Sequence, residues 1–247
     1  MVRPFARHYD SIYSDKDYES DIAALTKMCG EDLAARHVIE IGAGTGNHTV
    51  RLARLVRKLV SIEIDADFAE MAQLKVQDAA CTNVDFQTVP LEELPPFDFD
   101  GAAAFFNVLN YIAPERRQSL IEALAARLKP GSWFVTDLWN GELVLLDPPR
   151  PETREKKCGM TSVRQEITPV LDALAGTVRL SYNIEVEQKG SIERFTEELT
   201  MHVWRLSELT SMMKQAGFSD IEFRDRRDFP AAANEGSWHV WMRATRR

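Results

Sequence analysis

Apolar and polar positions change period along residues 1–146. Short apolar runs alternate with stretches whose apolar residues recur every three or four positions, the period of a helix face. The runs predict buried strands and the stretches predict helices. The predicted strands are 38–41, 58–64, 84–89, 101–106 and 133–138, and the predicted helices are 18–28, 47–55, 66–77 and 114–128. This alternation favours right-handed βαβ units in a mostly parallel sheet, where ligands bind at the carboxyl ends of the strands.

The pattern changes after Trp139. Three prolines between residues 147 and 151 predict a rigid linker. Polar residues then alternate with Val, Ile, Thr, Tyr and Phe, which predicts antiparallel strands at 161–168, 177–187 and 192–204. A helix at 207–216 and strands at 221–224 and 239–244 follow. We therefore expect a core made of 1–146 and 205–247, with an antiparallel β insertion at 147–204.

Composition and charge exclude several classes of protein. The 247 residues are 45% apolar, enough for one large α/β domain with a small appendage. The formal net charge is −8, so a general basic surface for nucleic acid is absent. Cys29, Cys81 and Cys158 are widely spaced, which favours a reducing compartment without disulfides or zinc. Neither a signal peptide nor an apolar run of membrane-spanning length is present, so we expect a cytoplasmic protein with no membrane contact.

Three glycines follow the first predicted strand at alternate positions, Gly42, Gly44 and Gly46. Glycine lets a ligand approach the backbone closely, and the N–H groups of the next helix point to the same place. A dinucleotide fingerprint would place its third glycine at Asn47, so the spacing does not suit a pyrophosphate. Glu63 ends the next strand, where a carboxylate can accept both ribose hydroxyls.

Residues 40–46 (EIGAGTG) resemble motif I of the class I S-adenosylmethionine-dependent methyltransferases. Residues 97–100 and the turn at 128–133 resemble two further family segments, and Glu63 falls on the ribose-binding acid. The resemblance covers nearly the whole chain. It implies an α/β fold with a Rossmann-like, seven-stranded, mostly parallel sheet whose last strand is antiparallel, and an antiparallel insertion after the fifth strand. It also implies S-adenosyl-L-methionine as methyl donor and S-adenosyl-L-homocysteine as product.

The same resemblance implies the residues that contact the cofactor. They are Tyr9, Tyr18, Glu40, Gly42, Ala43, Gly44, Gly46, Glu63, Ile64, Leu91 and Phe105. One position departs from the family, because Pro90 stands where an acid usually binds the adenine amino group. Glu92 and Glu93 are near but out of register, so we expect backbone groups and Leu91 to hold the adenine.

The opening segment suggests a subfamily. Its pattern Phe5-x3-Tyr9-Asp10-x2-Tyr13, with residues 16–18 (KDY) and the insertion, resembles bacterial N-methyltransferases of nucleotide-linked amino sugars. Residues 106–111 and 137–141 resemble related enzymes of sugar pathways. The resemblance implies that Tyr9 and Tyr18 close over the methionine end and that Tyr9 and Tyr111 are catalytic. The implied substrate contacts are Asn107, Tyr111, Trp139, Trp238 and His239.

Several alternatives remain open at this point. The N-terminal tyrosines could form a helix face packed on the sheet, Asn107 and Trp139 could belong to the core, and His239 could be structural. No His–Asp pair and no acidic metal cluster stands out, which favours an amine acceptor over a hydroxyl and predicts no metal. An O-methyltransferase, an N-methyltransferase of another small metabolite, an NAD-binding oxidoreductase and a non-catalytic S-adenosylmethionine-binding protein are the other functions considered. A homodimer through the insertion is possible.

Overall fold

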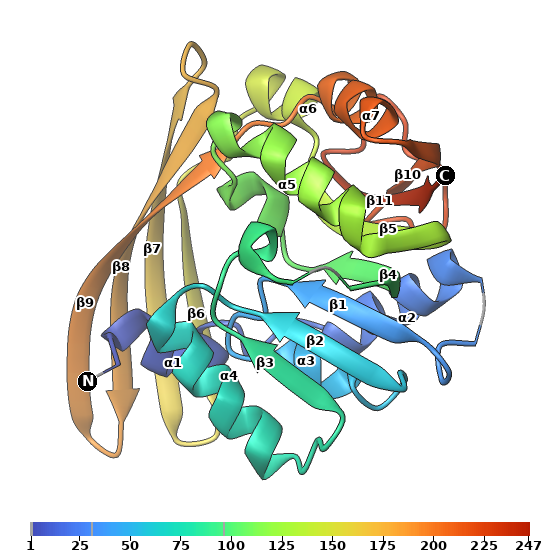
Figure 1. Cartoon of the computed structure of the whole chain (residues 1–247). Coiled ribbons are helices and arrows are strands. Elements are labelled where there is room, and N and C mark those ends of the chain that lie inside the picture. Colours follow the sequence, from blue (N-terminus) through green and yellow to red (C-terminus); the bar gives the residue numbers. More distant parts are fainter. Residues whose placement is uncertain (1, 31, 96) are drawn as a thin grey trace.

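The computed structural model describes residues 2–30, 32–95 and 97–247. Its larger sheet, sheet A, has seven strands in the order β10-β11-β5-β4-β1-β2-β3 (Figure 1). Strands β1 to β5 pair in parallel, and β11 is antiparallel to both β5 and β10. This arrangement confirms the predicted fold class. The strands are β1 (His37–Ile41), β2 (Lys58–Ile62), β3 (Val84–Gln87), β4 (Phe99–Ala104), β5 (Leu128–Trp139), β10 (Phe218–Asp225) and β11 (His239–Arg246).

The helices predicted from the sequence are present with small shifts at their termini, whereas the helices at Pro4–Ile12 and Gly141–Leu146 were not predicted. Asp17 accepts a hydrogen bond from the Ser20 N–H at the start of the second helix, and Gly30 ends it in a left-handed conformation. The third helix ends at Leu52, three residues earlier than predicted. The helices are α1 (Pro4–Ile12), α2 (Tyr18–Cys29), α3 (Asn47–Leu52), α4 (Ala66–Asp78), α5 (Pro114–Arg127), α6 (Gly141–Leu146) and α7 (Leu206–Gln215), with 3₁₀ turns η1 (Leu91–Glu93) and η2 (Val108–Tyr111).

The centre of sheet A is buried on both faces. Ile39, Ala102 and Val135 are among the residues with no exposed surface. A Cβ on Gly101 would lie 2.3 Å from the ring of Trp133, so the small residues of β4 make room for this tryptophan on β5. Burial on both faces explains why these strands are continuous apolar runs in the sequence.

The insertion forms a second sheet, sheet B, with four antiparallel strands in the order β6-β7-β8-β9. These are β6 (Glu152–Cys158), β7 (Thr161–Asp172), β8 (Thr177–Gln188) and β9 (Ser191–His202). The sequence predicts only three strands here. The pattern misses β6 because this edge strand has charged residues on both faces and no apolar alternation.

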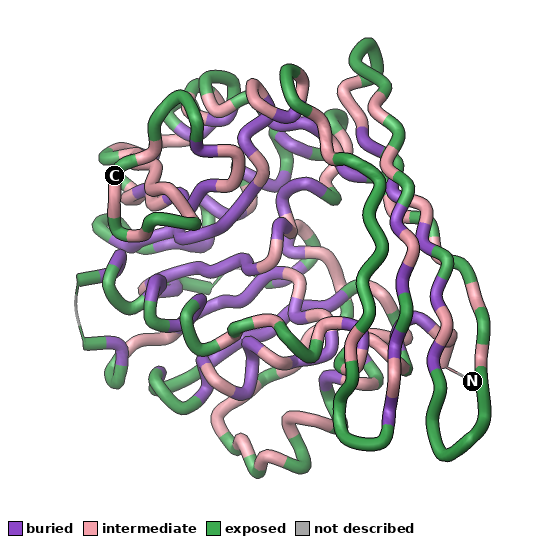
Figure 2. Tube along the Cα trace, turned by 180° about the vertical axis from the view of Figure 1, so that it is seen from behind, coloured by how far each residue is buried: buried purple, intermediate pink, exposed green. Residues whose placement is uncertain are grey.

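One face of sheet B packs on the rest of the protein and the other is open, so buried and exposed residues alternate along its inner strands (Figure 2). Helix α1 lies against this sheet and also contacts α4 of the core (Figure 1). Phe5 and Ile12 of α1 are buried in the same cluster as Val163 and Ile184 of the sheet. The N-terminal segment is therefore held between the two sheets, directly beside the carboxyl ends of β1, β2 and β4.

Candidate active site

A cavity of about 320 Å³ lies at the carboxyl ends of β1, β2 and β4. Its lining is mostly apolar, with a few polar groups from the strand ends, as is usual for a small-molecule site. The lining residues are Arg3, Tyr9, Tyr18, Ile41, Gly42, Ala43, Gly44, Thr45, Asn47, His48, Ile62, Glu63, Ile64, Asp65, Phe68, Pro90, Leu91, Glu92, Phe105, Phe106, Val108, Tyr111, Ile112, Arg116, Leu120 and Leu199.

Glycine is required for a different reason at each of the three positions after β1. All adopt left-handed φ values, between 56° and 83°. A Cβ on Gly42 would lie 2.5 Å from Val108 Cγ2, and a Cβ on Gly46 would lie 3.1 Å from the Ala72 backbone. At Gly44 nothing lies within 4 Å of the Cβ position, and the residue lines the cavity. Gly44 therefore leaves room for a ligand, whereas Gly46, which does not line the cavity, allows α3 to pack on α4.

Two carboxylates predicted to bind the cofactor occupy different environments. Glu63 lines the cavity, and its Oε2 and Oε1 accept hydrogen bonds from the backbone N–H of Gly44 (2.8 Å) and of Asp65 (2.9 Å). Burial raises the pKa of Glu63 despite these bonds. In this position the carboxylate can also accept hydrogen bonds from a diol, as ribose binding requires.

Glu40 lies behind the glycine turn and does not line the cavity. Its Oε2 accepts hydrogen bonds from Thr49 Oγ1 (2.6 Å) and Ser61 Oγ (2.7 Å), while its buried Oε1 has no partner among the described residues. Burial raises the pKa of Glu40 to about 7, and its hydroxyl partners only partly oppose this shift. The expected direct contact of Glu40 with the cofactor is replaced in the structure by a buried link between β1, β2 and α3.

The lining of the cavity includes four aromatic residues from α1, α4 and the segment after β4, which we call the aromatic wall: Tyr9, Phe68, Phe106 and Tyr111. The ring of Tyr9 lies 5.1 Å from that of Phe68. Tyr111 is enclosed by the protein, yet 47% of its surface is accessible because it borders the cavity. Burial raises the pKa of both Tyr9 and Tyr111 well above the ordinary value, so both phenols are neutral at physiological pH.

Tyr18 also lines the cavity, as predicted, whereas Tyr13 packs behind Tyr9 with ring centroids 4.6 Å apart. The Tyr18 hydroxyl is buried and has no hydrogen-bond partner among the described residues. Burial raises its pKa to about 12. An unpartnered buried hydroxyl beside a cavity is costly unless a ligand completes its hydrogen bonding.

Four of the predicted substrate residues do not line the cavity: Asn107, Trp139, Trp238 and His239. Trp139 and Trp238 pack on each other, with ring centroids 5.0 Å apart, next to sheet B. Trp139 was expected at the substrate from its strand end and Trp238 from its place at the last hairpin, but both are partly buried against the cluster formed with sheet B. Tyr111 is the one predicted substrate residue that reaches the cavity.

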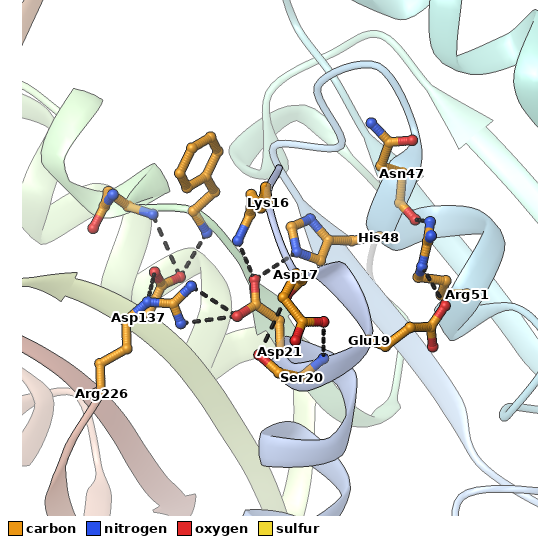
Figure 3. A network of polar contacts seen from close by, with 12 residues as sticks. Lys16, Asp17, Glu19, Ser20, Asp21, Asn47, His48, Arg51, Asp137 and Arg226 are labelled. Carbon is orange, nitrogen blue, oxygen red and sulfur yellow. Dashed lines mark hydrogen bonds and ion pairs between the residues drawn. The ribbon is translucent and has the colours of Figure 1, made fainter. Parts of the chain in front are cut away.

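The structure also reveals a charged network that the sequence did not indicate (Figure 3). His48 lines the cavity, and its Nε2 lies 2.9 Å from Oδ2 of the buried Asp21. Lys16 Nζ lies 2.5 Å from the same oxygen, and Arg226 binds the other oxygen at 2.7 Å. Burial lowers the pKa of His48, so its neutral ring donates to Asp21.

A second pair joins His239 Nε2 to Asp137 Oδ2 at 3.0 Å. No His–Asp pair stands out in the sequence, yet the fold forms these two. His48 and Asp21 are 27 positions apart, and His239 and Asp137 are 102 positions apart, so only the fold brings them together.

The cavity fits S-adenosylmethionine on its own features. Gly44 leaves a space that a side chain would fill, Glu63 offers carboxylate oxygens, and Tyr18 carries an unsatisfied hydroxyl. Glu92 and Arg116, paired at 2.9 Å, border an apolar slot with Leu91, Ile112 and Leu120 that suits a flat ring. Within residues 2–30, 32–95 and 97–247, no group of three His, Cys, Asp or Glu side chains could hold a metal, and no helix is long and apolar enough to cross a membrane.

Comparison with known proteins identifies the class of enzyme. Residues 38–131, which contain the glycine turn and Glu63, match the model of a methyltransferase domain. The chain is an S-adenosylmethionine-dependent methyltransferase. This methyltransferase is 26% identical over 203 residues to demethylmenaquinone methyltransferase of Lactiplantibacillus plantarum, and the match covers 80% of this chain and 76% of the relative.

Two solved structures share the fold of this methyltransferase. An S-adenosylmethionine-dependent methyltransferase from Clostridium acetobutylicum superposes with a TM-score of 0.82 at 17% identity, covering 98% of this chain and 97% of the other. The sugar N-methyltransferase KedS8 from a Streptoalloteichus species superposes with a TM-score of 0.78 at 16% identity, covering 97% and 92%. Both likenesses extend over sheet B as well as sheet A.

Proposed function

We propose that this methyltransferase transfers the methyl group to the amine of a nucleotide-linked amino sugar. The observation that carries the proposal is the aromatic wall, where the neutral phenols of Tyr9 and Tyr111 face the cavity. The likeness to a sugar N-methyltransferase over 97% of the chain supports the same class of acceptor.

The chemistry requires alignment more than activation. S-adenosylmethionine supplies a methyl group that is already activated on a sulfonium, so the protein has to orient the acceptor and exclude water. The oxygen of a neutral phenol at Tyr111 or Tyr9 can accept an N–H hydrogen bond and thereby direct the nitrogen lone pair. As the N–C bond forms from the lone pair of the neutral amine, the S–C bond breaks and its electron pair leaves with the sulfur of S-adenosylhomocysteine. The methylated ammonium then releases one proton to solvent.

The residues proposed to hold the cofactor are those of the glycine turn together with Glu63, Ile64, Leu91 and Phe105. Tyr18 would donate its free hydroxyl to the carboxylate at the methionine end. Sheet B would form the acceptor side through Leu199, the lining residue that it contributes. The same sheet has an open face, which could support a homodimer.

A hydroxyl acceptor is the second candidate, because the His48–Asp21 pair at the cavity could serve as a base. The position of the ring argues against this role. His48 stacks on Phe105 at 4.5 Å, meets Tyr18 edge-on, and is only 5% exposed. It lies beside Tyr18 rather than on the aromatic wall.

The test is methyl transfer from labelled S-adenosylmethionine to paired nucleoside-diphosphate sugars that differ only in an amino or a hydroxyl group. We expect transfer to the amino member of a pair and none to its hydroxyl counterpart. Transfer to the hydroxyl sugar alone, with loss of activity in His48→Asn, would instead establish the second candidate. Gly44→Val serves as the negative control for contaminating activity.

A further inference from the structure

The chain turns sharply between β4 and η2, at Phe106 and Asn107. Both residues adopt left-handed conformations, with φ values of 66° and 63°. Two consecutive non-glycine residues in this region are strained, because the Cβ of an L-residue crowds the following carbonyl. Such a conformation persists only when surrounding contacts hold it.

The turn determines where several cavity residues lie. Phe106 itself lines the cavity, and Val108 directly after the turn packs on Gly42 of the glycine turn. The following 3₁₀ turn carries Tyr111. A shift of the turn would therefore move Val108, which packs on the glycine turn, and also Phe106 and Tyr111 of the aromatic wall.

Asp137 at the end of β5 makes the contacts that hold the turn. Its Oδ1 accepts hydrogen bonds from the backbone N–H of Phe106 at 2.6 Å and of Asn107 at 3.4 Å. The carboxylate has no exposed surface and does not line the cavity. Its direct hydrogen bonds to the segment that lines the cavity are those to the turn, and a second, indirect link runs through Arg226 and Asp21 to His48.

Two side chains, those of His239 and Arg226, hold the carboxylate of Asp137 in place. His239 Nε2 lies 3.0 Å from its Oδ2. Arg226 Nε lies 3.6 Å from the same oxygen, while the other end of this guanidinium binds Asp21 (Figure 3). Burial alone would raise the pKa of Asp137, but His239 and Arg226 lower it, so the acceptor is ionised at neutral pH.

We propose that Asp137 is a positioning residue for methyl transfer, which holds the strained Phe106–Asn107 turn in the conformation that cofactor binding requires. His239, which the sequence suggested as a substrate contact, acts one step further back by orienting Asp137. Asn107 is in the turn because of its tolerance of left-handed φ, and its buried Oδ1 has no partner among the described residues.

The test uses the strain itself. Asp137→Asn retains the shape of the side chain but removes the negative charge from the group that accepts hydrogen bonds from both N–H groups. Asn107→Gly removes much of the strain, since glycine adopts positive φ readily. We measure the dissociation constant of S-adenosylhomocysteine by calorimetry, and hydrogen exchange of residues 105–112, in both single variants and the double variant. These readouts do not depend on the acceptor, so they stand apart from the proposed amino-sugar activity.

We expect Asp137→Asn to raise the dissociation constant of S-adenosylhomocysteine about tenfold. Hydrogen exchange of residues 105–112 should also become faster, because the turn loses its charged hydrogen-bond acceptor. Asn107→Gly in the same chain should recover most of the affinity. Asp21→Asn is the matched control, since it removes an equally buried carboxylate from the same Arg226 without touching the turn. Any loss of affinity in that variant should not be recovered by Asn107→Gly.

The proposal is overturned if Asn107→Gly restores no affinity for S-adenosylhomocysteine in the Asp137→Asn protein. It is also overturned if Asn107→Gly restores the affinity of the Asp21→Asn protein to the same extent. If Asp137→Asn alone fails to fold, the double variant decides. A folded double variant that binds S-adenosylhomocysteine within about threefold of the wild type supports the proposal. A double variant that is also unfolded shows that Asp137 is needed for the fold rather than for the turn.

Discussion

The glycine turn and the aromatic wall line the same cavity but are built in different ways. The turn comes from a single stretch of chain, and its contacts to a ligand are backbone groups whose geometry the glycines allow. The aromatic wall joins side chains from α1, α4 and the segment after β4, which are far apart in sequence. The comparison teaches that the proposed donor side depends on local backbone shape, whereas the proposed acceptor side depends on how distant elements pack.

Gly44→Val should cause the largest loss, because it places a branched side chain in the ligand space and strains a left-handed backbone. We expect the dissociation constant of S-adenosylhomocysteine to rise by about 100-fold or more in calorimetry. Gly159→Val is the matched control, since Gly159 also has positive φ and open space around it but lies in the β6–β7 turn. Similar losses of affinity in both variants would mean that strain, and not the cavity, is responsible.

Glu63→Gln should have the next largest effect, since it replaces an ionised acceptor of two ribose hydroxyls. We expect S-adenosylhomocysteine to bind about 30-fold more weakly, as for the loss of charge-assisted hydrogen bonds. Because burial raises the pKa of Glu63 above 4.5, wild-type affinity should also fall as the pH is lowered towards that raised value, and this dependence should vanish in the variant. Glu93→Gln, at an exposed position nearby, should bind normally.

Tyr111→Phe tests the aromatic wall. We expect turnover to fall about tenfold, because one hydrogen bond to the acceptor is lost. The dissociation constant of S-adenosylhomocysteine should stay within about twofold of the wild-type value, because no contact to the cofactor is lost. Steady-state kinetics and calorimetry measure the two quantities. Tyr13→Phe, behind the wall, is the control. Weaker cofactor binding in Tyr111→Phe would move this residue to the donor side of the comparison.

Glu40→Gln should have the smallest effect on cofactor affinity, less than about threefold, because Glu40 lies behind the glycine turn. Its effect should appear in stability instead. The folded pKa of about 7 lies above the ordinary 4.5, so the free energy of unfolding of the wild type should fall as the pH rises between these values. Titration of Glu40 should lower the free energy of unfolding by up to about 3 kcal/mol over this pH range, and this contribution should be absent in the variant. Denaturant unfolding of both proteins at pH 5 and pH 8 measures the difference. A large loss of S-adenosylhomocysteine affinity would return Glu40 to the binding site.

Prediction from the sequence succeeded where structure is local. The order of strands and helices in sheet A, the glycine turn and the strand-end position of Glu63 all follow from periodicity and spacing. The charged edge strand β6 escaped because burial on one face is what produces alternation, and β6 has almost none. The sequence did not show that Trp139 and Trp238 pack on each other outside the cavity lining, because neither a strand end nor a hairpin says which layer covers it.

The sequence by itself determined the fold class and the glycine turn with Glu63 at the next strand end, because these features depend on residues close together in the chain. Only the tertiary structure decided which carboxylate faces the cavity, which tyrosines line it, and that Asp137 holds a strained turn 31 positions away. The physical reason is that buried charges such as Asp21 and Asp137 need partners, and those partners come from any part of the chain that packs beside them.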